Sequence, residues 1–198
     1  MKEQIIESAL KHFLQHGIRK ITIQKLVLPL GISTKTMYRY FNDKQELLEE
    51  CLKVHYRESD KGVLRLMDRS PNVVVSICQI YLKAVDRDFG INHLFYDDLN
   101  YYYPDVQDKV MREQHRAFEI ITAMIEQGKN EGYFLTYLKP PVVLETLMEL
   151  YTSVTRYGVY KEFAMRRELI KQTIIIYLRG ICTDKGIQVM DQIKELAN

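Results

Sequence analysis

Hydrophobic positions in this 198-residue chain recur every three or four residues, the spacing of helices that bury one face. The first such stretch, residues 2–16, ends at Gly17, a residue type that commonly terminates helices. No convincing alternation with a period of two is present, so no strand is expected. The pattern predicts further helices at about residues 23–30, 34–41, 43–69, 71–88, 92–103, 105–129, 140–158 and 165–181, and a short one from about residue 188.

Polar residues precede the short N-terminal helices and are suited to capping them. Thr22 stands before the second helix and Ser33 before the third, and each hydroxyl can accept a hydrogen bond from a free amide of the first turn. Asp43 with Glu46 three residues later resembles a capping box at the start of the fourth helix. The first part of the chain is therefore predicted to be several short helices joined by tight turns.

Charge is distributed unevenly along the chain. The net charge is only +2, but residues 8–42 contain no Asp or Glu and carry six Lys and Arg side chains. A basic segment without carboxylates suits a polyanion such as nucleic acid, because phosphates are attracted by the cations. A solvated basic face without a partner would have the same composition, so charge alone leaves both interpretations open.

The third predicted helix has the composition of a helix that reads DNA. It follows a short helix and a glycine turn, and this arrangement is typical of a helix-turn-helix, whose second helix enters the major groove. Met37 and Phe41 are four residues apart and are expected to pack inward. The other residues are then free to contact phosphates and base edges. These outward residues are Lys35, Thr36, Tyr38, Arg39 and Tyr40.

In this region the sequence resembles the tetracycline-repressor (TetR) family of bacterial regulators. The likeness lies in residues 17–48, GIRKITIQKLVLPLGISTKTMYRYFNDKQELL, with Gly-Ile-Ser at the turn, Met-Tyr-Arg-Tyr-Phe after it, and a lysine two residues after Asn42. Helix order and overall length agree with the family over the rest of the chain. The sequence departs from the family pattern at Lys35, where many members have glycine, and at Leu28-Pro29-Leu30, where small residues are common.

The resemblance implies a fold and a function. We expect an all-α protein with an N-terminal three-helix helix-turn-helix DNA-binding domain at residues 1–47. A C-terminal helical ligand-binding and dimerisation domain is expected at residues 48–198. The family implies a transcription regulator, a repressor, that binds a pseudo-palindromic operator in double-stranded DNA as a homodimer. An unidentified small-molecule effector would favour a conformer with lower operator affinity.

The resemblance also assigns DNA contacts by position. It places Thr22 and Lys44, at the starts of the second and fourth helices, against phosphate, where free amides and the positive helix end assist. It places Ser33 and Thr34 at the turn and the entrance of the groove. The residues that it directs to base edges or the backbone are Lys35, Thr36, Tyr38 and Tyr40.

For the C-terminal domain, the resemblance implies a dimer in which the last two long helices of each chain form a four-helix bundle. The sequence permits this, because each of these helices has an apolar stripe. The stripes could instead pack only within one chain, which needs a core of its own. The stripe residues are Leu144, Leu147, Met148 and Tyr151 on the first helix, and Ile170, Ile174, Tyr177 and Leu178 on the second.

The family resemblance further implies an effector pocket in the C-terminal domain, where tyrosines are frequent. Tyrosine suits a pocket wall that needs apolar area with an occasional hydroxyl group. Each of these aromatic residues could equally be an ordinary core or surface residue. The expected lining residues are Tyr81, Phe95, Tyr96, Tyr102, His115, Phe118, Met124 and Tyr151.

The sequence lacks the motifs of several catalytic and metal-binding classes. It has no glycine-rich phosphate loop, no His-Glu-x-x-His motif and no paired-cysteine zinc spacing, so we expect no enzyme activity, no cofactor and no metal site. Cys51, Cys78 and Cys182 are too scattered for a disulfide framework and are expected to be reduced. Adjacent Asp97 and Asp98 are expected on a solvated helix face. Without a signal-peptide core or a long apolar run, the protein is expected in the cytoplasm and not in a membrane.

Two other functions remain compatible with the sequence. One is a DNA-binding regulator controlled by a protein partner instead of a ligand. The other is an all-α protein-interaction module or enzyme whose basic N-terminus has another purpose. Binding to duplex DNA that weakens steeply with salt would disfavour the module, and a small molecule that releases the DNA would disfavour the protein partner.

Overall fold

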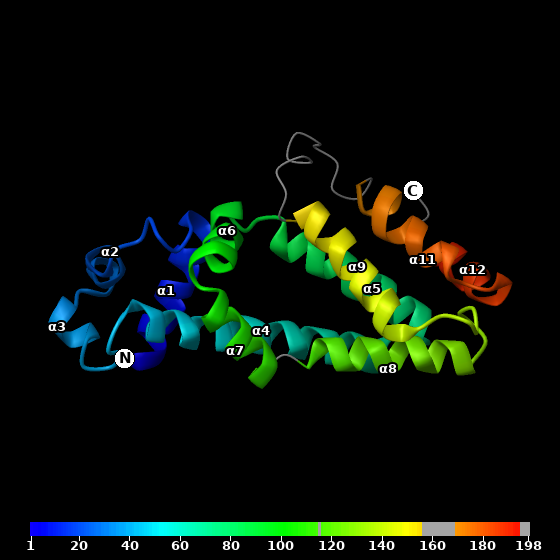
Figure 1. The fold of residues 1–198 in the computed structure, drawn as a ribbon, viewed down its shortest axis with the longest axis horizontal. Coiled ribbons are helices and arrows are strands. Elements are labelled where there is room, and N and C mark those ends of the chain that lie inside the picture. Colours follow the sequence, from blue (N-terminus) through cyan, green and yellow to red (C-terminus); the bar gives the residue numbers. More distant parts are fainter. Residues whose placement is uncertain (115, 156–168, 195–198) are drawn as a thin grey trace. The chain divides into compact units, whose positions relative to one another are not determined.

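The structure, a computed structural model, describes residues 1–114, 116–155 and 169–194. Within these residues all regular structure is helical (Figure 1), and the only pairing of β type is a single bridge between Phe134 and Cys182. The predicted all-α fold class is therefore confirmed. The helices belong to two compact units, one of residues 1–59 and 91–115, the other of residues 60–90 and 116–198. Among the described residues, no helix combines the length and apolar character needed to cross a membrane.

The first unit is built on a core to which most of its helices contribute. Fully buried side chains include Phe13, Met37, Leu48, Phe95 and Val110. Helix α6 packs against α1 (Figure 1), and the amide of Asn92 just before α6 donates to the carbonyl of Leu14 in α1 (2.8 Å). The helices are α1 (Lys2–His16), α2 (Ile23–Val27), the 3₁₀ turn η1 (Leu28–Leu30), α3 (Thr34–Met37), the first part of α4 (Lys44–Arg69), α6 (His93–Tyr102) and α7 (Pro104–Gln114).

This unit contains more of the chain than the predicted DNA-binding domain of residues 1–47. Helices α6 and α7 belong to it because their apolar residues Phe95, Leu99, Val106 and Val110 enter the same core as those of the N-terminal helices. The predicted boundary separates functions, whereas the compact unit is defined by packing. The assignment of functions to the parts of the chain stays a prediction.

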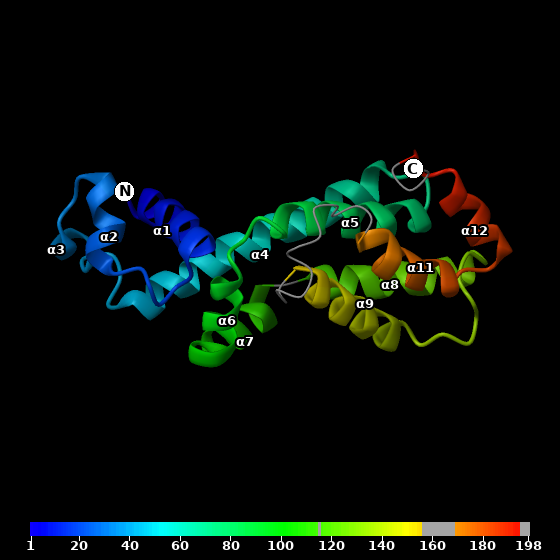
Figure 2. The ribbon, with the colours of Figure 1, turned by 90° about the horizontal axis from the view of Figure 1, so that it is seen from above.

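The second unit is a separate helical bundle around α5. Helix α5 packs against α8, α9 and α12, and buried residues such as Ile77, Ile125, Leu147 and Ile174 form its core. Helices α8 and α9 lie side by side in this unit (Figure 2). Its helices are the rest of α4, α5 (Val73–Asp88), α8 (Ala117–Asn130), α9 (Pro140–Thr155), the π-helical turn η3 (Lys171–Ile175), α11 (Ile176–Gly180) and α12 (Asp184–Asp191).

The two short helices of the N-terminal region end earlier than the pattern predicts. Pro29 lies in the 3₁₀ turn that replaces the last turn of the predicted helix 23–30, and Gly31 then takes a left-handed conformation with φ of 62°. Helix α3 ends at Met37, and residues 38–40 continue as turns. These turns bring Phe41 into the core, where it is almost fully buried. Periodicity alone does not distinguish a continuing helix from such a turn.

The predicted helix 105–129 is two helices, α7 and α8. The carboxylate of Asp60 in α4 accepts hydrogen bonds from the backbone N–H groups of Arg116 (3.0 Å) and Ala117 (3.1 Å). These two bonds satisfy amides at the start of α8 that have no partner within their own helix. The chain can therefore break here without leaving buried donors unpaired.

Other helix ends differ from the prediction by a few residues. Helix α5 begins at Val73 and is capped by Asn72, and α12 begins at Asp184 and is capped by Thr183. Helices α1 and α4 end where the pattern predicts, at His16 and Arg69. The end of the predicted helix 140–158 and the start of the predicted helix 165–181 lie outside the described residues.

Candidate nucleic-acid interface

Hydroxyl groups cap α2 and α3, as the sequence predicts. Oγ1 of Thr22 accepts a hydrogen bond from the N–H of Lys25 (3.4 Å), and Oγ of Ser33 accepts one from the N–H of Thr36 (3.0 Å). The hydroxyls of Ser33 and Thr36 also lie 2.9 Å apart and share a hydrogen bond. Since each cap orders the first turn of a very short helix, these residues hold the helix-turn-helix in shape.

A reciprocal pair of side chains caps the start of α4. Oδ1 of Asp43 accepts from the N–H of Glu46 (2.8 Å), and Oε2 of Glu46 reaches back to the N–H of Asn42 (2.7 Å). The predicted capping interaction is confirmed, with Asn42 as the residue that Glu46 reaches. Two acidic side chains next to the basic segment are thus used to bind backbone amides.

Helix α3 and the turn after it divide into an inner and an outer face. Met37 and Phe41 are buried, as predicted. Tyr38 and Tyr40 are 52% and 40% exposed, which leaves much aromatic surface in water. All the predicted contact residues from Ser33 to Tyr40 lie on this segment. Those that are exposed are Ser33, Lys35, Tyr38, Arg39 and Tyr40, while Thr34 and Thr36 are partly exposed.

The electrostatic character of this surface follows from its composition. The six cations of residues 8–42 are Lys11, Arg19, Lys20, Lys25, Lys35 and Arg39, and all are exposed. No carboxylate of the same segment neutralises them. All of these cations except Lys11 of α1 lie on α2, α3 and the turns beside them, and this surface therefore attracts polyanions.

The side chain of Lys44 is hydrogen-bonded within the first unit. It is partly buried, Nζ donates to the carbonyl oxygen of Ile18 (2.6 Å), and the ammonium lies 5.8 Å from the centre of the Phe13 ring. Burial lowers the pKa of Lys44 below its ordinary value, while the negative charge of Asp98 acts in the opposite direction. The ammonium is thus already bound within the first unit, and the phosphate contact that the family resemblance implies for it stays a prediction.

Asp98 is a residue whose importance the sequence does not reveal. It is only 8% exposed, although a solvated face is predicted for it. Its Oδ2 accepts hydrogen bonds from the backbone N–H groups of Ile18 (2.7 Å) and Arg19 (2.8 Å). The prediction of a solvated face is therefore wrong. The sequence does not indicate this contact, because the partners are about 80 positions away in the chain. One sequence feature could have indicated burial: Asp98 lies four residues from both Leu94 and Tyr102, and so shares a helix face with two large side chains.

The predicted effector-lining residues are divided between the two units. Phe95 and Tyr96 are buried in the core of the first unit, and Tyr102 is 55% exposed on it. His115 lies outside the described residues. The structure brings together the members in the second unit, which are Tyr81, Met124, Tyr151 and the partly buried Phe118.

Within the second unit, Tyr81 and Tyr151 form a buried polar cluster with Asp88. The two tyrosine rings are 6.4 Å apart in an edge-to-face arrangement. The hydroxyl of Tyr151 donates to the buried carboxylate of Asp88, which also accepts from Arg87 Nη2 (2.9 Å). The hydroxyl of Tyr81 is buried and has no hydrogen-bond partner among the described residues. Burial raises the pKa of Tyr81 above its ordinary value.

The predicted dimer stripes face inward within one chain. Leu144, Leu147, Tyr151, Ile170, Ile174 and Leu178 are buried in the core of the second unit, and Met148 and Tyr177 are partly buried against it. An apolar stripe does not indicate which surface covers it. In this structure the stripes are covered by other residues of the same unit. The outward faces of α9 and α11 carry exposed apolar side chains at Val142 (60%) and Ile176 (62%).

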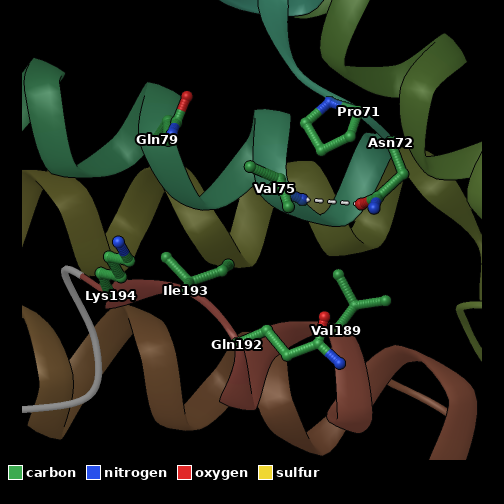
Figure 3. A pocket seen from close by; sticks show the side chains of 8 residues that line it. All are labelled: Pro71, Asn72, Val75, Gln79, Val189, Gln192, Ile193 and Lys194. Atoms are coloured by element: carbon green, nitrogen blue, oxygen red, sulfur yellow. Dashed lines mark hydrogen bonds between the residues drawn. The ribbon is translucent and has the colours of Figure 1, made fainter.

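A surface groove of about 400 Å³ lies where α5 begins (Figure 3). In it the side chain of Asn72 accepts a hydrogen bond from the N–H of Val75 (3.0 Å) and so caps α5. The predicted effector residues are not among those that line the groove. Its lining residues are Pro71, Asn72, Val75, Gln79, Val189, Gln192, Ile193 and Lys194.

Comparison with known proteins supports the N-terminal assignment. Residues 5–51 match the family model described as bacterial regulatory proteins, tetR family. This match covers α2, α3 and the capping residues described above. Among proteins with curated descriptions, no match was found.

Solved structures of similar fold cover nearly the whole chain. The fatty acid degradation regulator FadR from Bacillus halodurans is 19% identical, with 90% of this chain and 95% of that chain covered and a TM-score of 0.73. The ketosteroid transcriptional regulator KstR2 of Mycobacterium tuberculosis is 18% identical (92% and 95% covered, TM-score 0.63). A TetR-family transcriptional regulator from Agrobacterium tumefaciens is 14% identical (92% and 97% covered, TM-score 0.76). At these identities the likeness shows the fold alone.

Proposed function

Because this chain belongs to the TetR family of bacterial regulators, we propose that it is a repressor that binds a pseudo-palindromic operator as a homodimer. A small molecule bound in the second unit would lower operator affinity by favouring another conformer. The observation that carries the proposal is the capped α2–α3 pair, whose outer face is exposed and free of carboxylates.

DNA binding is supported by the exposed side chains on the outer face of α3 and the turn after it. Lys35 and Arg39 are exposed cations that can reach phosphates or guanine, and Tyr38 and Tyr40 add hydroxyl groups and apolar rings. The first turn of α3, ordered by Ser33, is the part of a recognition helix that contacts base edges. In a dimer, two such helices would lie one helical turn of DNA apart, about 34–36 Å.

Dimerisation is supported by the apolar side chains that α9 and α11 expose. Val142 and Ile176 are each more than half exposed, whereas most apolar residues of these helices are buried. A second copy that packs against these outward faces would remove them from water. The expected interface therefore uses the outward faces of the two helices and not the buried stripes.

An effector site in the second unit is supported by the Tyr81 hydroxyl. A buried hydroxyl without a partner costs the protein about 1–3 kcal/mol, which a hydrogen bond from a ligand would recover. The rings of Tyr81 and Tyr151 provide apolar area beside this hydroxyl. These properties suit a mainly apolar molecule that carries a hydroxyl or carbonyl group.

Selection of bound sequences from random duplex DNA, with purified protein at near-physiological salt, tests the proposed function. We expect a two-fold symmetric site and an affinity that falls steeply with added salt. The matched control is a Tyr38→Ala/Arg39→Ala variant, which removes two exposed side chains and leaves the core intact. Equal enrichment by this control, or a folded protein that enriches no sequence with or without candidate effectors, would contradict the proposal.

Lys35→Ala is expected to change which operator bases are preferred. Lys35 is exposed on α3 next to the Ser33 cap, where it can reach a base edge, and a specific base contact is worth about 1–3 kcal/mol of discrimination. The selected motifs of the variant and the wild-type protein would be compared. Lys20→Ala, exposed but outside the helix-turn-helix, should weaken binding without changing the motif. An unchanged motif for Lys35→Ala would show that Lys35 reads no base.

Tyr81→Phe is expected to stabilise the protein and weaken its response to the effector. Removing the unpartnered buried hydroxyl should raise the melting temperature by roughly 2–4 °C, about 1 kcal/mol. Tyr151→Phe is the matched control and should lower the melting temperature, because Asp88 loses a donor. Thermal unfolding measures both. A lower melting temperature for Tyr81→Phe would mean that the hydroxyl is satisfied in the folded protein.

A further inference from the structure

One face of α6 holds the turn between α1 and α2, residues 17–21, called here the α1–α2 turn. Asp98 binds the N–H groups of Ile18 and Arg19 at 2.7 and 2.8 Å. One turn of helix further on, the ring of Tyr102 stacks with the guanidinium of Arg19, 3.9 Å from the ring centre. The spacing of four residues places these contacts on a single helix face. Helix α6 thus fixes the backbone of the turn and one of its cations.

Lys44 binds the same turn from a second helix. Its ammonium donates to the carbonyl oxygen of Ile18 (2.6 Å), whereas Asp98 accepts from the N–H of that residue. The side chain of Ile18 is fully buried between these contacts. Burial lowers the pKa of Lys44 overall, and the negative charge of Asp98 opposes this change, so the two opposite charges are close enough to interact. Both backbone groups of Ile18 are therefore held by charged side chains, from α6 on one side and α4 on the other.

We propose that Lys44 and Asp98 are paired positioning residues that fix the α1–α2 turn for DNA binding, and that Lys44 is not a phosphate ligand. The inference rests on the proposed DNA-binding function. It differs from the role that the family resemblance assigns to Lys44, because the ammonium is already bound within the first unit. Moving it to a phosphate would break a charge-assisted hydrogen bond and remove a positive charge from beside buried Asp98.

The turn matters for DNA binding because of what it carries. It places exposed Arg19 and Lys20 at the surface and leads directly into Thr22, the cap of α2. Both cations line a surface hollow of about 390 Å³, whose other lining residues are Leu94 and Asp98. One side of each cation therefore faces open space. A shift of the turn would therefore displace two cations and the start of α2 together.

The salt dependence of DNA binding distinguishes positioning from phosphate contact. Each phosphate contact contributes about −0.9 to the slope of log affinity against log salt concentration. Lys44→Met should weaken binding at least tenfold and leave this slope unchanged. Lys25→Met and Lys35→Met, which remove exposed cations near α2 and α3, provide the comparison and should reduce the slope. A slope reduced by about 0.9 in Lys44→Met would overturn the proposal.

A double-mutant cycle tests whether the two residues act as a pair. Asp98→Asn removes the charge and keeps the size of the side chain. Each single variant should weaken binding to the selected site, and the double variant should bind no more than about twofold more weakly than the weaker of the two. Losses that multiply would show that Lys44 and Asp98 act independently, contrary to the proposal. The melting temperature of each variant shows whether it is folded.

Lysine reactivity in the wild-type protein tests the inference without relying on a variant that folds. Reductive methylation with formaldehyde, followed by mass spectrometry, would be measured with and without the selected duplex. Lys44 should react no more slowly with DNA than without it, while exposed Lys25 and Lys35 become protected. Protection of Lys44 by DNA would overturn the proposal. If no duplex is bound, the proposed function fails, whereas DNA binding with protection of Lys44 would contradict the positioning role alone.

Discussion

Gly17→Val is expected to lower the stability of the first unit by about 3–5 kcal/mol and to weaken operator binding more than tenfold. Gly17 has φ of 81° and ψ of 166°, a conformation essentially restricted to glycine. A Cβ atom there would lie 2.8 Å from Cβ of Leu94 and 3.1 Å from the Asp98 carboxylate that holds the α1–α2 turn. Strain and collision would both displace that turn.

Thermal unfolding and operator affinity measure this prediction. The matched control is Gly62→Ala, because Gly62 lies in α4 and an added Cβ meets nothing within 4 Å. This control should be neutral or stabilising by up to about 1 kcal/mol, since alanine favours helix. A Gly17→Val protein that melts within 1 °C of the wild type and binds with unchanged affinity would show that the turn tolerates a side chain.

Asp60→Ala is expected to destabilise the second unit by about 2–4 kcal/mol, which corresponds to a fall in melting temperature of roughly 5–15 °C. The carboxylate of Asp60 is buried and accepts from the N–H groups of Arg116 and Ala117, and alanine would leave both donors unpaired. The start of α8 should open more often as a result. Hydrogen–deuterium exchange of α8 amides, together with thermal unfolding, measures the effect.

Asp68→Ala is the control for this prediction, because Asp68 is an exposed aspartate of the same helix α4. It should change the melting temperature by no more than about 2 °C, as exposed substitutions usually do. Equal melting temperatures for the Asp60→Ala and Asp68→Ala variants would show that the buried cap contributes no stability. Destabilisation by Asp60→Ala without faster exchange in α8 would place its contribution elsewhere.

Features that depend on nearby residues could be predicted from the sequence. The caps at Thr22, Ser33 and Asp43 involve donors three residues away, so the local pattern contains all the information needed. The inward packing of Met37 and Phe41 follows from their spacing in the same way. The helical fold class follows from the apolar period, which every long helix shares.

Features that depend on distant residues could not be predicted. The break between α7 and α8 requires the carboxylate of Asp60, which is 56 and 57 positions from its partners. Asp98 appears in the sequence as one of two adjacent acids, and only the folded chain brings it to Ile18. Lys44 is likewise bound to the carbonyl oxygen of Ile18, 26 positions earlier in the chain. In each case a charged side chain that suits solvent is instead bound to backbone groups from another part of the chain.

The predicted dimer stripes illustrate a different limit. Leu147 and Ile174 are fully buried within one chain, and Val142 and Ile176, on the opposite faces, are exposed. Helical spacing identifies an apolar face but not the surface that covers it. The residues expected to line the effector pocket were predicted from their aromatic type. Residue type does not indicate that Phe95 lies in the core of the first unit and Tyr81 in that of the second.

The three thiols described by the structure have a practical consequence. Cys51, Cys78 and Cys182 are all buried, and burial raises the pKa of Cys78 and Cys182 to about 12 and that of Cys51 higher still. Because thiolates are the reactive species, the native protein should resist maleimide reagents at neutral pH. A cysteine introduced at exposed Lys20 would then carry a spin label or fluorophore alone. In a dimer, the distance between the two labels could then be measured with and without DNA, and no native cysteine would have to be removed.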